Sequence, residues 1–348
     1  MGMIKLPESS VRFFKENIDE IFNTGNLAEG DWIKKLASLC SNYTSAKNSI
    51  VFNSNGSGLL AALKIFQTYM DKKSIFIQSN TMYGVKTLAI TSGLEYLGSV
   101  DCGLSFLSPS HVQVEDFIKK LKNPKQSVFL ITHIGGWVNP DIEKIAEICK
   151  RYGVALLEDC AHSLGSLLNG RHTGLFGDAG VYSLYSTKAI PAGEGGLLVT
   201  NNDELAYYLN KFIIYDRFEK EMDIGVNFRM SEINALLAYA VMSETENIIS
   251  AKYYLANRYI KACDLVGIKY LSPTEGGQRS NLYKFILISK TNQPEDEFRH
   301  IKLRTSPVYD YTLGSDPENI TSKHICLPIW FGLEEDTVLS VIDMLTAV

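Results

Sequence analysis

An aspartate and a lysine in the middle of the chain could act together as a carboxylate and an amine in one catalytic site. Asp159 comes just after the apolar run 154–157, and Lys188 ends the largely apolar run 181–188. An amine that attacks an aldehyde needs a lowered pKa, and a pyridine ring that acts as an electron sink needs a carboxylate beside its nitrogen. Lys188 and Asp159 match these two needs. Taken singly, each has a simpler explanation, as a solvated lysine and as a helix-capping aspartate.

A phosphate anchor would complete such a site, and one segment has the right composition for it. Residues 55–58 read Asn-Gly-Ser-Gly and precede the apolar run 59–66. The start of a helix offers backbone N–H groups and a positive dipole end to an anion. Gly56 and Ser57 are therefore candidate phosphate ligands, and Ser183 is a candidate hydroxyl donor to the same group. The segment matches neither the dinucleotide nor the P-loop glycine pattern.

Other chemistries find less support in the sequence. The chain has six histidines and six cysteines, but neither an HExxH motif nor a CxxC pair. A metal site is therefore not predicted. The GxSxG motif of a serine hydrolase is also missing. Scattered cysteines without a dense framework are typical of a reducing compartment, so a cytoplasmic location is expected.

The elements that would position these residues form an alternating pattern. A short apolar strand at 49–52 leads through the glycine segment into a helix at 59–66. A strand at 127–132, a helix that ends at Gly153 and a strand at 154–157 form a βαβ unit. Strands that are apolar throughout are typical of a parallel sheet covered on both faces. The chain is therefore expected to be an α/β protein with its ligands at the carboxyl ends of the strands.

The alternation of predicted strands and helices ends near residue 242. A long helical segment follows, then short strand-like runs at 268–271 and 283–288, and a final helix at 334–345. We therefore predict a large domain over residues 1–242 and a smaller α+β domain over residues 243–348. A chain of 348 residues is long enough for two such domains.

The amino-acid composition of the chain excludes some classes of binding partner. The formal net charge is −5, the pI is about 5.8, and no block of basic residues resembles a nucleic-acid surface. No run of about 18 apolar residues is present, so neither a membrane span nor membrane association is predicted. The partners expected are small molecules.

A set of short motifs follows in order along the chain. The segments are 24–30 (TGNLAEG), 55–57 (NGS), 133–136 (HIGG), 158–162 (EDCAH), 183–188 (SLYSTK), 194–196 (EGG), 225–230 (GVNFRM) and 327–328 (LP). Together they resemble the motifs of the DegT/DnrJ/EryC1/StrS family of sugar aminotransferases, which depend on pyridoxal phosphate (PLP), and the resemblance extends over nearly the whole chain. The fold implied is PLP-dependent transferase fold type I, with a mostly parallel sheet covered by helices in the large domain.

The resemblance implies a role for each matching residue. Lys188 would form the Schiff base with PLP and carry protons, and Asp159 would pair with the pyridine nitrogen. His162 would contact the ring hydroxyl. The remaining cofactor-binding residues would be Gly56, Ser57 and Ser183 at the phosphate, Met82 or its neighbour Tyr83 over the ring, and Asn227 reaching the phosphate from the partner subunit of a homodimer.

The activity implied is a ping-pong transfer of an amino group from a donor, expected to be glutamate, to a nucleotide-linked keto-sugar in amino-sugar or surface-polysaccharide biosynthesis. Relatives that remove a hydroxyl group carry His in place of the lysine, so Lys188 favours amino transfer. The phosphate segment departs from the family's usual SGT, and the chain is short for the family. An aminocyclitol ketone or a sugar acid therefore stays open as the acceptor, and a non-catalytic regulator of the same fold stays open as a third reading.

Overall fold

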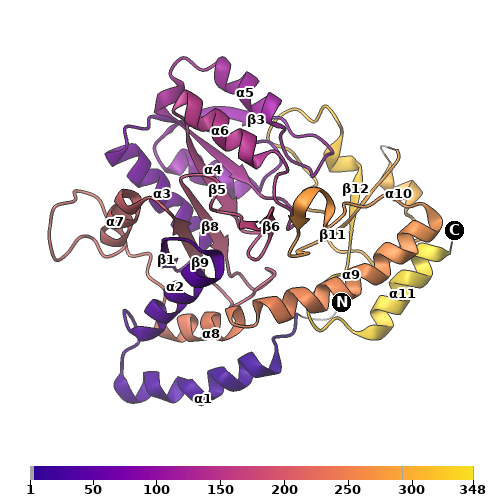
Figure 1. Ribbon diagram of the computed structural model, residues 1–348, viewed down its shortest axis with the longest axis horizontal. Coiled ribbons are helices and arrows are strands. Elements are labelled where there is room, and N and C mark those ends of the chain that lie inside the picture. Colours follow the sequence, from indigo (N-terminus) through magenta and orange to yellow (C-terminus); the bar gives the residue numbers. More distant parts are fainter. Residues whose placement is uncertain (1–3, 292, 348) are drawn as a thin grey trace.

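A seven-stranded sheet lies at the centre of the computed structural model, which describes residues 4–291 and 293–347 (Figure 1). Its strands are β1 (Asn48–Phe52), β2 (Ser74–Gln78), β3 (Glu95–Val100), β4 (Ser127–Thr132), β5 (Ala155–Cys160), β8 (Ala179–Ser183) and β9 (Gly196–Thr200). Their order is β1-β9-β8-β5-β4-β2-β3. The neighbours from β3 to β8 run parallel, and β9 pairs antiparallel with both β8 and β1. The expected mostly parallel sheet is confirmed.

Helices cover both faces of this sheet. They are α1 (Glu8–Thr24), α2 (Asp31–Thr44), α3 (Asn55–Tyr69), α4 (Tyr83–Thr91), α5 (His111–Lys119), α6 (Ile142–Tyr152), α7 (Asp203–Phe212) and α8 (Glu232–Met242). Alternate side chains of a strand point to opposite faces. Leu130 of β4 accordingly packs in the cluster of α3 and α7, whereas Phe129 and Ile131 pack in the cluster of α5 and α6. This two-sided burial explains why β4 is apolar throughout.

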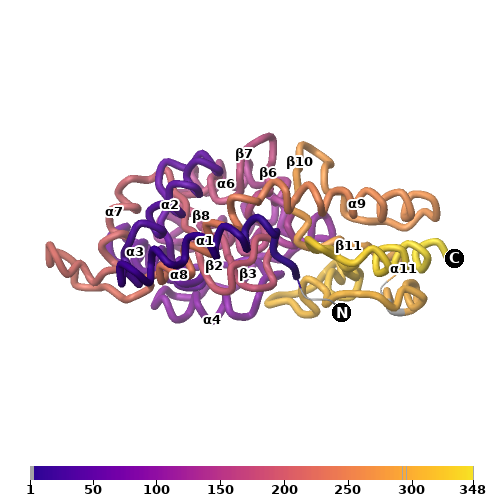
Figure 2. Tube along the Cα trace, turned by 90° about the horizontal axis from the view of Figure 1, so that it is seen from below, coloured from indigo at the N-terminus to yellow at the C-terminus, as the bar shows by residue number. Residues whose placement is uncertain are grey.

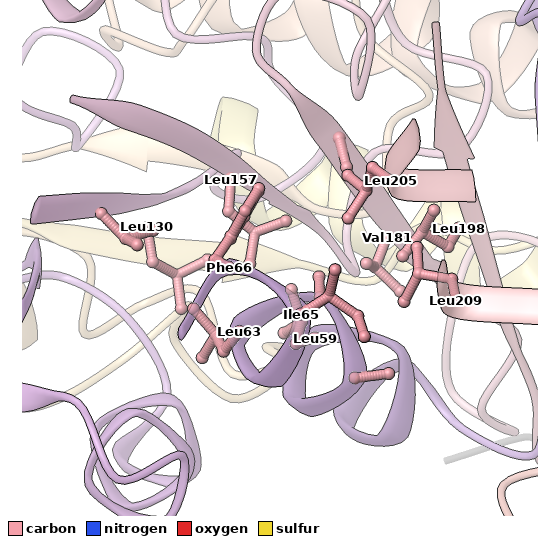
Figure 3. Packing of buried hydrophobic residues seen from close by; sticks show 14 of the residues in the cluster. Leu59, Leu63, Ile65, Phe66, Leu130, Leu157, Val181, Leu198, Leu205 and Leu209 are labelled. Carbon is pink, nitrogen blue, oxygen red and sulfur yellow. The ribbon is translucent and has the colours of Figure 1, made fainter. Parts of the chain in front are cut away.

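Helix α3 packs against the middle of the sheet (Figure 3). Its residues Leu59, Leu63 and Phe66 contribute to one fully buried cluster with Leu157 and Val181 of the strands. Burial of a side chain of this size stabilises the fold by roughly 1.5–3 kcal/mol. Gly58 allows the close approach, because a Cβ there would lie 2.7 Å from Val181. The first turn of α3 is thereby held against the strand ends.

The C-terminal third forms a separate apolar cluster. Its residues come from α9 (Thr245–Val266), β11 (Phe285–Ile288), β12 (His324–Leu327), α11 (Glu335–Thr346) and the segment that follows α10 (Pro294–Glu297). Helices α9 and α11 lie side by side at the end of the molecule away from α7 (Figures 1 and 2). The strand β10 (Gln278–Arg279) nevertheless pairs with β6 (Leu167–Leu168), which also pairs with β7 (Arg171–His172). A domain boundary after residue 242 stays a prediction.

Three strand predictions differ from the structure. Strand β5 runs on to Cys160, so Asp159 lies within the strand and pairs with Thr132 and Val181. Strand β8 ends at Ser183, whose hydroxyl accepts a hydrogen bond from Tyr185 N and turns the chain, so Lys188 lies in the following loop. The run 268–271 forms only an isolated bridge, between Tyr270 and Leu287.

The length and composition of the helices decide whether any of them could span a membrane. Within the two described stretches, no helix combines the length and the apolar composition that a bilayer span requires.

Candidate active site

The carboxylate of Asp159 lies where β5 ends beside the first turn of α3. Its Oδ1 accepts hydrogen bonds from Asn55 Nδ2 at 3.2 Å and from the backbone N–H of Ala161 at 3.0 Å. The same Asn55 amide also donates to the carbonyl oxygen of Val181 at 2.7 Å, in the adjacent strand β8. One amide therefore ties the start of α3 to the ends of two strands.

Asp159 is buried without an ion-pair partner among the residues that the structure describes. Burial raises its pKa, whereas the Ala161 N–H, the charge of Lys188 and the Asn55 amide lower it. Burying a carboxylate that lacks a cationic partner is costly. A cation bound at this position would remove that cost.

The N-terminus of α3 forms the neighbouring wall of the site. Ser54 caps the helix, and its Oγ accepts a hydrogen bond from Ser57 N at 3.1 Å and lies 2.9 Å from Ser57 Oγ. The first N–H groups of a helix have no acceptor within the helix, so they can bind an anion. Gly196 must lack a side chain here, because a Cβ would collide with the Ser54 carbonyl oxygen.

Gly56 and Ser183 lie close to this helix start. A Cβ on Gly56 would meet only ordinary contacts, the nearest 3.6 Å away at Leu88, so the space in front of Gly56 is open. Ser183 ends β8, next to β9 and its Gly196. Its side chain is buried. The structure therefore places Gly56, Ser57 and Ser183, the three predicted phosphate ligands, around the elements that also hold Asp159.

Lys188 extends from the loop after β8 and is half-buried. Its Nζ lies 5.2 Å from the centre of the Tyr283 ring. Burial lowers the pKa of the amine, the nearby Asp159 charge raises it, and the Lys284 charge lowers it again. A lowered pKa increases the fraction of neutral amine, which is the nucleophilic form.

His162 packs against the ring of Tyr283 as a neutral imidazole. The two rings stack with centroids 4.3 Å apart and 23° between their planes. Burial, together with the charges of Lys188 and Lys284, holds the pKa of His162 well below its usual range. Its Nδ1 lies 3.3 Å from Gly135 N, which donates to it. The hydrogen-bond network thus assigns the remaining proton to Nε2.

A buried asparagine positions this stack. Asn281 Nδ2 donates to the carbonyl oxygens of His162 and Leu164, each at 2.9 Å, and its Oδ1 accepts from Tyr283 N at 2.9 Å. The loop after β5 and the segment before β11 are therefore fixed to each other by one side chain.

Met82 and Tyr83 both lie at the start of α4 and are more than half exposed. The backbone N–H of Tyr83 donates to the Tyr311 hydroxyl at 2.6 Å, and the neighbouring Tyr309 ring lies 6.0 Å from His162. The α4 start thus borders the site, and a role over the cofactor for Met82 or Tyr83 stays a prediction.

Asn227 lies on the surface, in the segment before α8. Its Oδ1 accepts a hydrogen bond from Arg229 N at 3.3 Å, and Arg229 Nε lies 3.8 Å from Glu29 Oε1. The N-terminal segment and the Asn227 segment are therefore adjacent. Glu232 joins these two segments a second time. Its carboxylate accepts hydrogen bonds from the backbone N–H groups of Gly30, Trp32 and Ile33 at 2.8–3.2 Å.

A second cluster of titratable groups lies behind the site. Ligand atoms of His133, Glu158 and Cys160 come within 4.8 Å of one another. The Glu158 carboxylate is already saturated, since Oε2 accepts from His133 and Gly174 N, and Oε1 accepts from two further backbone N–H groups, of residues 176 and 177. This cluster fixes the loop before β8 and orients the strand that carries Asp159.

Comparison with known proteins shows which family the chain belongs to. The model of the DegT/DnrJ/EryC1/StrS aminotransferase family matches residues 9–346. The chain belongs to this family. Aminotransferases of the family depend on PLP, so the chain is a PLP-dependent aminotransferase.

Three similar proteins show the range of the family. GDP-perosamine synthase of Vibrio cholerae is 26% identical over 65% of this chain and 67% of its own. A pleiotropic regulatory protein of Geobacillus stearothermophilus is 23% identical over 94% and 91%. The aminotransferase TlmJ of Streptoalloteichus hindustanus has the same fold, with a TM-score of 0.84, 21% identity and coverage of 99% and 97%.

The chemistry of the donor set fits PLP. The buried, unpaired Asp159 suits a protonated ring nitrogen, the α3 start suits a phosphate, and Lys188 supplies the amine. The sequence reasoning missed Tyr283 and Asn281 as site residues of this aminotransferase. They precede β11 in an ordinary-looking Asn-Leu-Tyr-Lys segment, and only the fold brings that segment to His162.

Proposed function

We propose that this enzyme transfers an amino group from glutamate to a nucleotide-linked keto-sugar by a ping-pong mechanism. The observation that carries the proposal is the convergence of Lys188, Asp159 and the α3 start on one site. PLP, when bound, supplies an electron sink that stabilises negative charge at the substrate carbon.

The cofactor would be held at both ends and on its faces. Asp159 would bind the ring nitrogen, and Gly56, Ser57 and Ser183 would bind the phosphate. His162 Nε2–H would donate to the ring hydroxyl, because its Nδ1 is already occupied by Gly135 N. Met82 would cover one face with a flexible thioether.

Lys188 would act as the covalent anchor and then as the base that moves the proton. Its burial favours the neutral amine needed to accept a proton. The Tyr283 ring shields the Nζ, and Asn281 holds Tyr283 in place.

A homodimer with shared sites is the second part of the proposal. Asn227 is exposed, as are the apolar side chains Tyr215 and Phe218 on the same stretch of chain, and Phe218 is 69% exposed. Contact with a second subunit would cover these rings and bring Asn227 to the partner's phosphate site.

The proposed acceptor is supported by one relative's name. The Vibrio cholerae protein is a GDP-perosamine synthase, and its name implies a nucleotide-linked amino sugar. We extend this class of acceptor to the present chain, together with a cytoplasmic location, where nucleotide-linked sugars would be available as substrates.

The direct test uses the purified protein. Wild type should be yellow, and borohydride reduction should fix the cofactor to the peptide that contains Lys188, as found by mass spectrometry. Lys188→Ala should lack this linkage. Glutamate should bleach the cofactor band, and a nucleotide-linked keto-sugar should restore it. A colourless wild-type protein that binds no PLP contradicts the proposal.

The same assay separates the alternatives. Restoration of the band by an aminocyclitol ketone or a sugar acid, and not by nucleotide-linked sugars, would assign the other acceptor classes. A protein that binds PLP but is not bleached by glutamate would fit a regulator.

A further inference from the structure

A small cavity of about 210 Å³ lies beside Lys188, between that loop, α9 and the segments around β11 and β12. Four lysines line it: Lys5, Lys188, Lys252 and Lys284. None of its described lining residues is an Asp or Glu. Lys5 pairs with Glu334 on the surface and Asp159 lies near Lys188, so the uncompensated positive charge belongs to Lys252 and Lys284.

Lys252, in the second turn of α9, is the most unusual of them. Its side chain is only 2% exposed, and no hydrogen bond or ion pair joins it to any residue in the described parts of the chain. Burial alone lowers the pKa of its amine to about 7. A buried amine without a partner costs stability. An apolar residue here would avoid this cost, so packing alone does not explain the lysine, whereas an anionic ligand would.

Lys284 faces the same cavity with partners that carry no charge. Its Nζ donates to the Ser306 carbonyl oxygen at 2.9 Å and contacts Ser306 Oγ at 3.3 Å. An ammonium group has three N–H donors. At least one donor of Lys284 is therefore available, and its positive charge is balanced by no carboxylate of the cavity wall.

The size of the cavity restricts the ligand. It is smaller than the roughly 300–1,000 Å³ pockets that hold drug-sized ligands. A cavity of this size can hold the carboxylate end of an amino acid. The cavity also reaches Lys188, where the donor's nitrogen must arrive.

We propose that Lys252 and Lys284 form a carboxylate-binding subsite that selects an acidic amino donor. The proposal rests on the proposed transamination and adds the residues that recognise the donor. The carboxylate would be bound by two amines, and charge-assisted hydrogen bonds of this kind are stronger than those between neutral groups.

Binding of an unreactive analogue tests the subsite apart from catalysis. Glutarate has two carboxylates and no amine, so it cannot react, and glutaramide is its neutral counterpart. Calorimetry on the PLP-loaded protein should detect glutarate and give binding at least about tenfold weaker for glutaramide. Lys252→Met should weaken glutarate binding by about tenfold or more, the loss expected for a charge-assisted hydrogen bond. Lys261→Met, an exposed lysine of the same helix, should leave it unchanged.

Lys284→Met provides a second variant if Lys252→Met does not fold, and it should also weaken glutarate. Equal glutarate binding by wild type and the folded variants would overturn the subsite. Binding of inorganic phosphate with no binding of glutarate would also overturn it and would assign the cavity to a phosphate of the acceptor.

Failure of the subsite and failure of the proposed function give different results. If glutamate bleaches wild type and Lys252→Met with the same KM, transamination stands and the subsite is wrong. If glutarate binds through Lys252 but glutamate does not bleach the cofactor, the subsite stands and the proposed reaction is wrong.

Discussion

The side-chain amide of Asn55 donates a hydrogen bond to the carboxylate of Asp159 over 3.2 Å, which joins the first turn of α3 to the end of β5. These are the elements proposed to bind the two ends of PLP. Because the same amide also binds Val181 O in β8, the distance between the two anchors is fixed by the fold before any cofactor arrives. Such preorganisation reduces the cost of ordering the site on binding.

The first prediction concerns Asp159→Asn. Burial raises the pKa of Asp159 in the folded cofactor-free protein, so the folded state holds the proton more tightly than the unfolded state. The carboxyl group therefore contributes most stability below its unfolded pKa of about 3.9 and loses it as pH rises through the raised folded value. At pH 7 the cofactor-free variant should unfold at a higher temperature than wild type, whereas its kcat should fall by about 10²–10³-fold.

Calorimetric unfolding and steady-state kinetics check the two parts of this prediction. Asp178→Asn is a matched control, since burial also raises the pKa of Asp178, but that carboxylate caps Leu156 N away from the proposed site. It should leave kcat nearly unchanged. If Asp159→Asn retains wild-type kcat, Asp159 does not serve the cofactor.

His162 gives the second prediction. Its pKa lies well below the usual range, so the imidazole stays neutral through the working pH range and contributes no step to the acidic limb of the kcat profile. His162→Gln should leave the shape of that limb unchanged, because an amide can donate the same hydrogen bond. His162→Leu should lower kcat/KM by about two- to tenfold, the value of one neutral hydrogen bond. Nitrogen NMR of labelled histidine should show a proton on Nε2; a protonated His162 at pH 7 would contradict the assignment.

The sequence predicted the central sheet better than it predicted the site's walls. The strand at 127–132 was correct, because two-sided burial makes strands such as β4 apolar. The helix predicted at 59–66 is present but begins earlier, at Asn55, so the glycine segment forms its first turn. Asp159 was predicted just after its strand and Lys188 at the end of its strand, whereas Asp159 lies within β5 and Lys188 lies five residues beyond the end of β8. The exact ends were missed, since backbone hydrogen bonds to neighbouring strands decide them.

Tyr283 and Lys252 could not be found from the sequence, because long-range packing alone brings them to Lys188. Neither belongs to a local pattern. A lysine in a helix such as α9 is ordinarily a solvated residue, and its burial is visible only when β12 and the segments around it are folded against that helix.

The third prediction tests the N-terminal segment through Glu232. Its buried carboxylate accepts three backbone N–H groups at the start of α2. Glu232→Gln keeps the shape but removes the charge, and it turns one acceptor oxygen into a donor that faces N–H groups. We expect the free energy of unfolding to fall by about 1–3 kcal/mol. Urea unfolding measures this, with the exposed Glu20→Gln on α1 as control; equal losses for both variants would show that the capping hydrogen bonds are unimportant.

The fourth prediction tests the shared site. Lys188→Ala and Asn227→Asp should each be nearly inactive, the second because a carboxylate would repel the phosphate. A dimer of one variant with the other would contain one intact site, made of Lys188 from one subunit and Asn227 from its partner. Random exchange of equal amounts should therefore restore about a quarter of wild-type activity. A mixture that stays inactive although native mass spectrometry detects mixed dimers would show that each subunit uses its own Asn227.

The last prediction concerns the stability effect of Lys252. Its folded pKa of about 7 lies below the ordinary value of 10.5, so the unfolded chain binds more protons than the folded chain between these two values. The buried amine therefore destabilises the fold fully below pH 7, and this penalty shrinks as pH rises toward 10.5. The groups that share its cavity are Lys5, Lys188, Lys284 and Tyr283. Because these groups are present in both proteins, the difference between wild type and Lys252→Met isolates Lys252.

Lys252→Met should be more stable than wild type by roughly a few kcal/mol at pH 6 and by much less at pH 10. Urea unfolding at the two pH values checks this, with Lys261→Met as control. A pH-independent difference would mean that the amine is solvated or paired in solution, and then no anion would be needed to explain it.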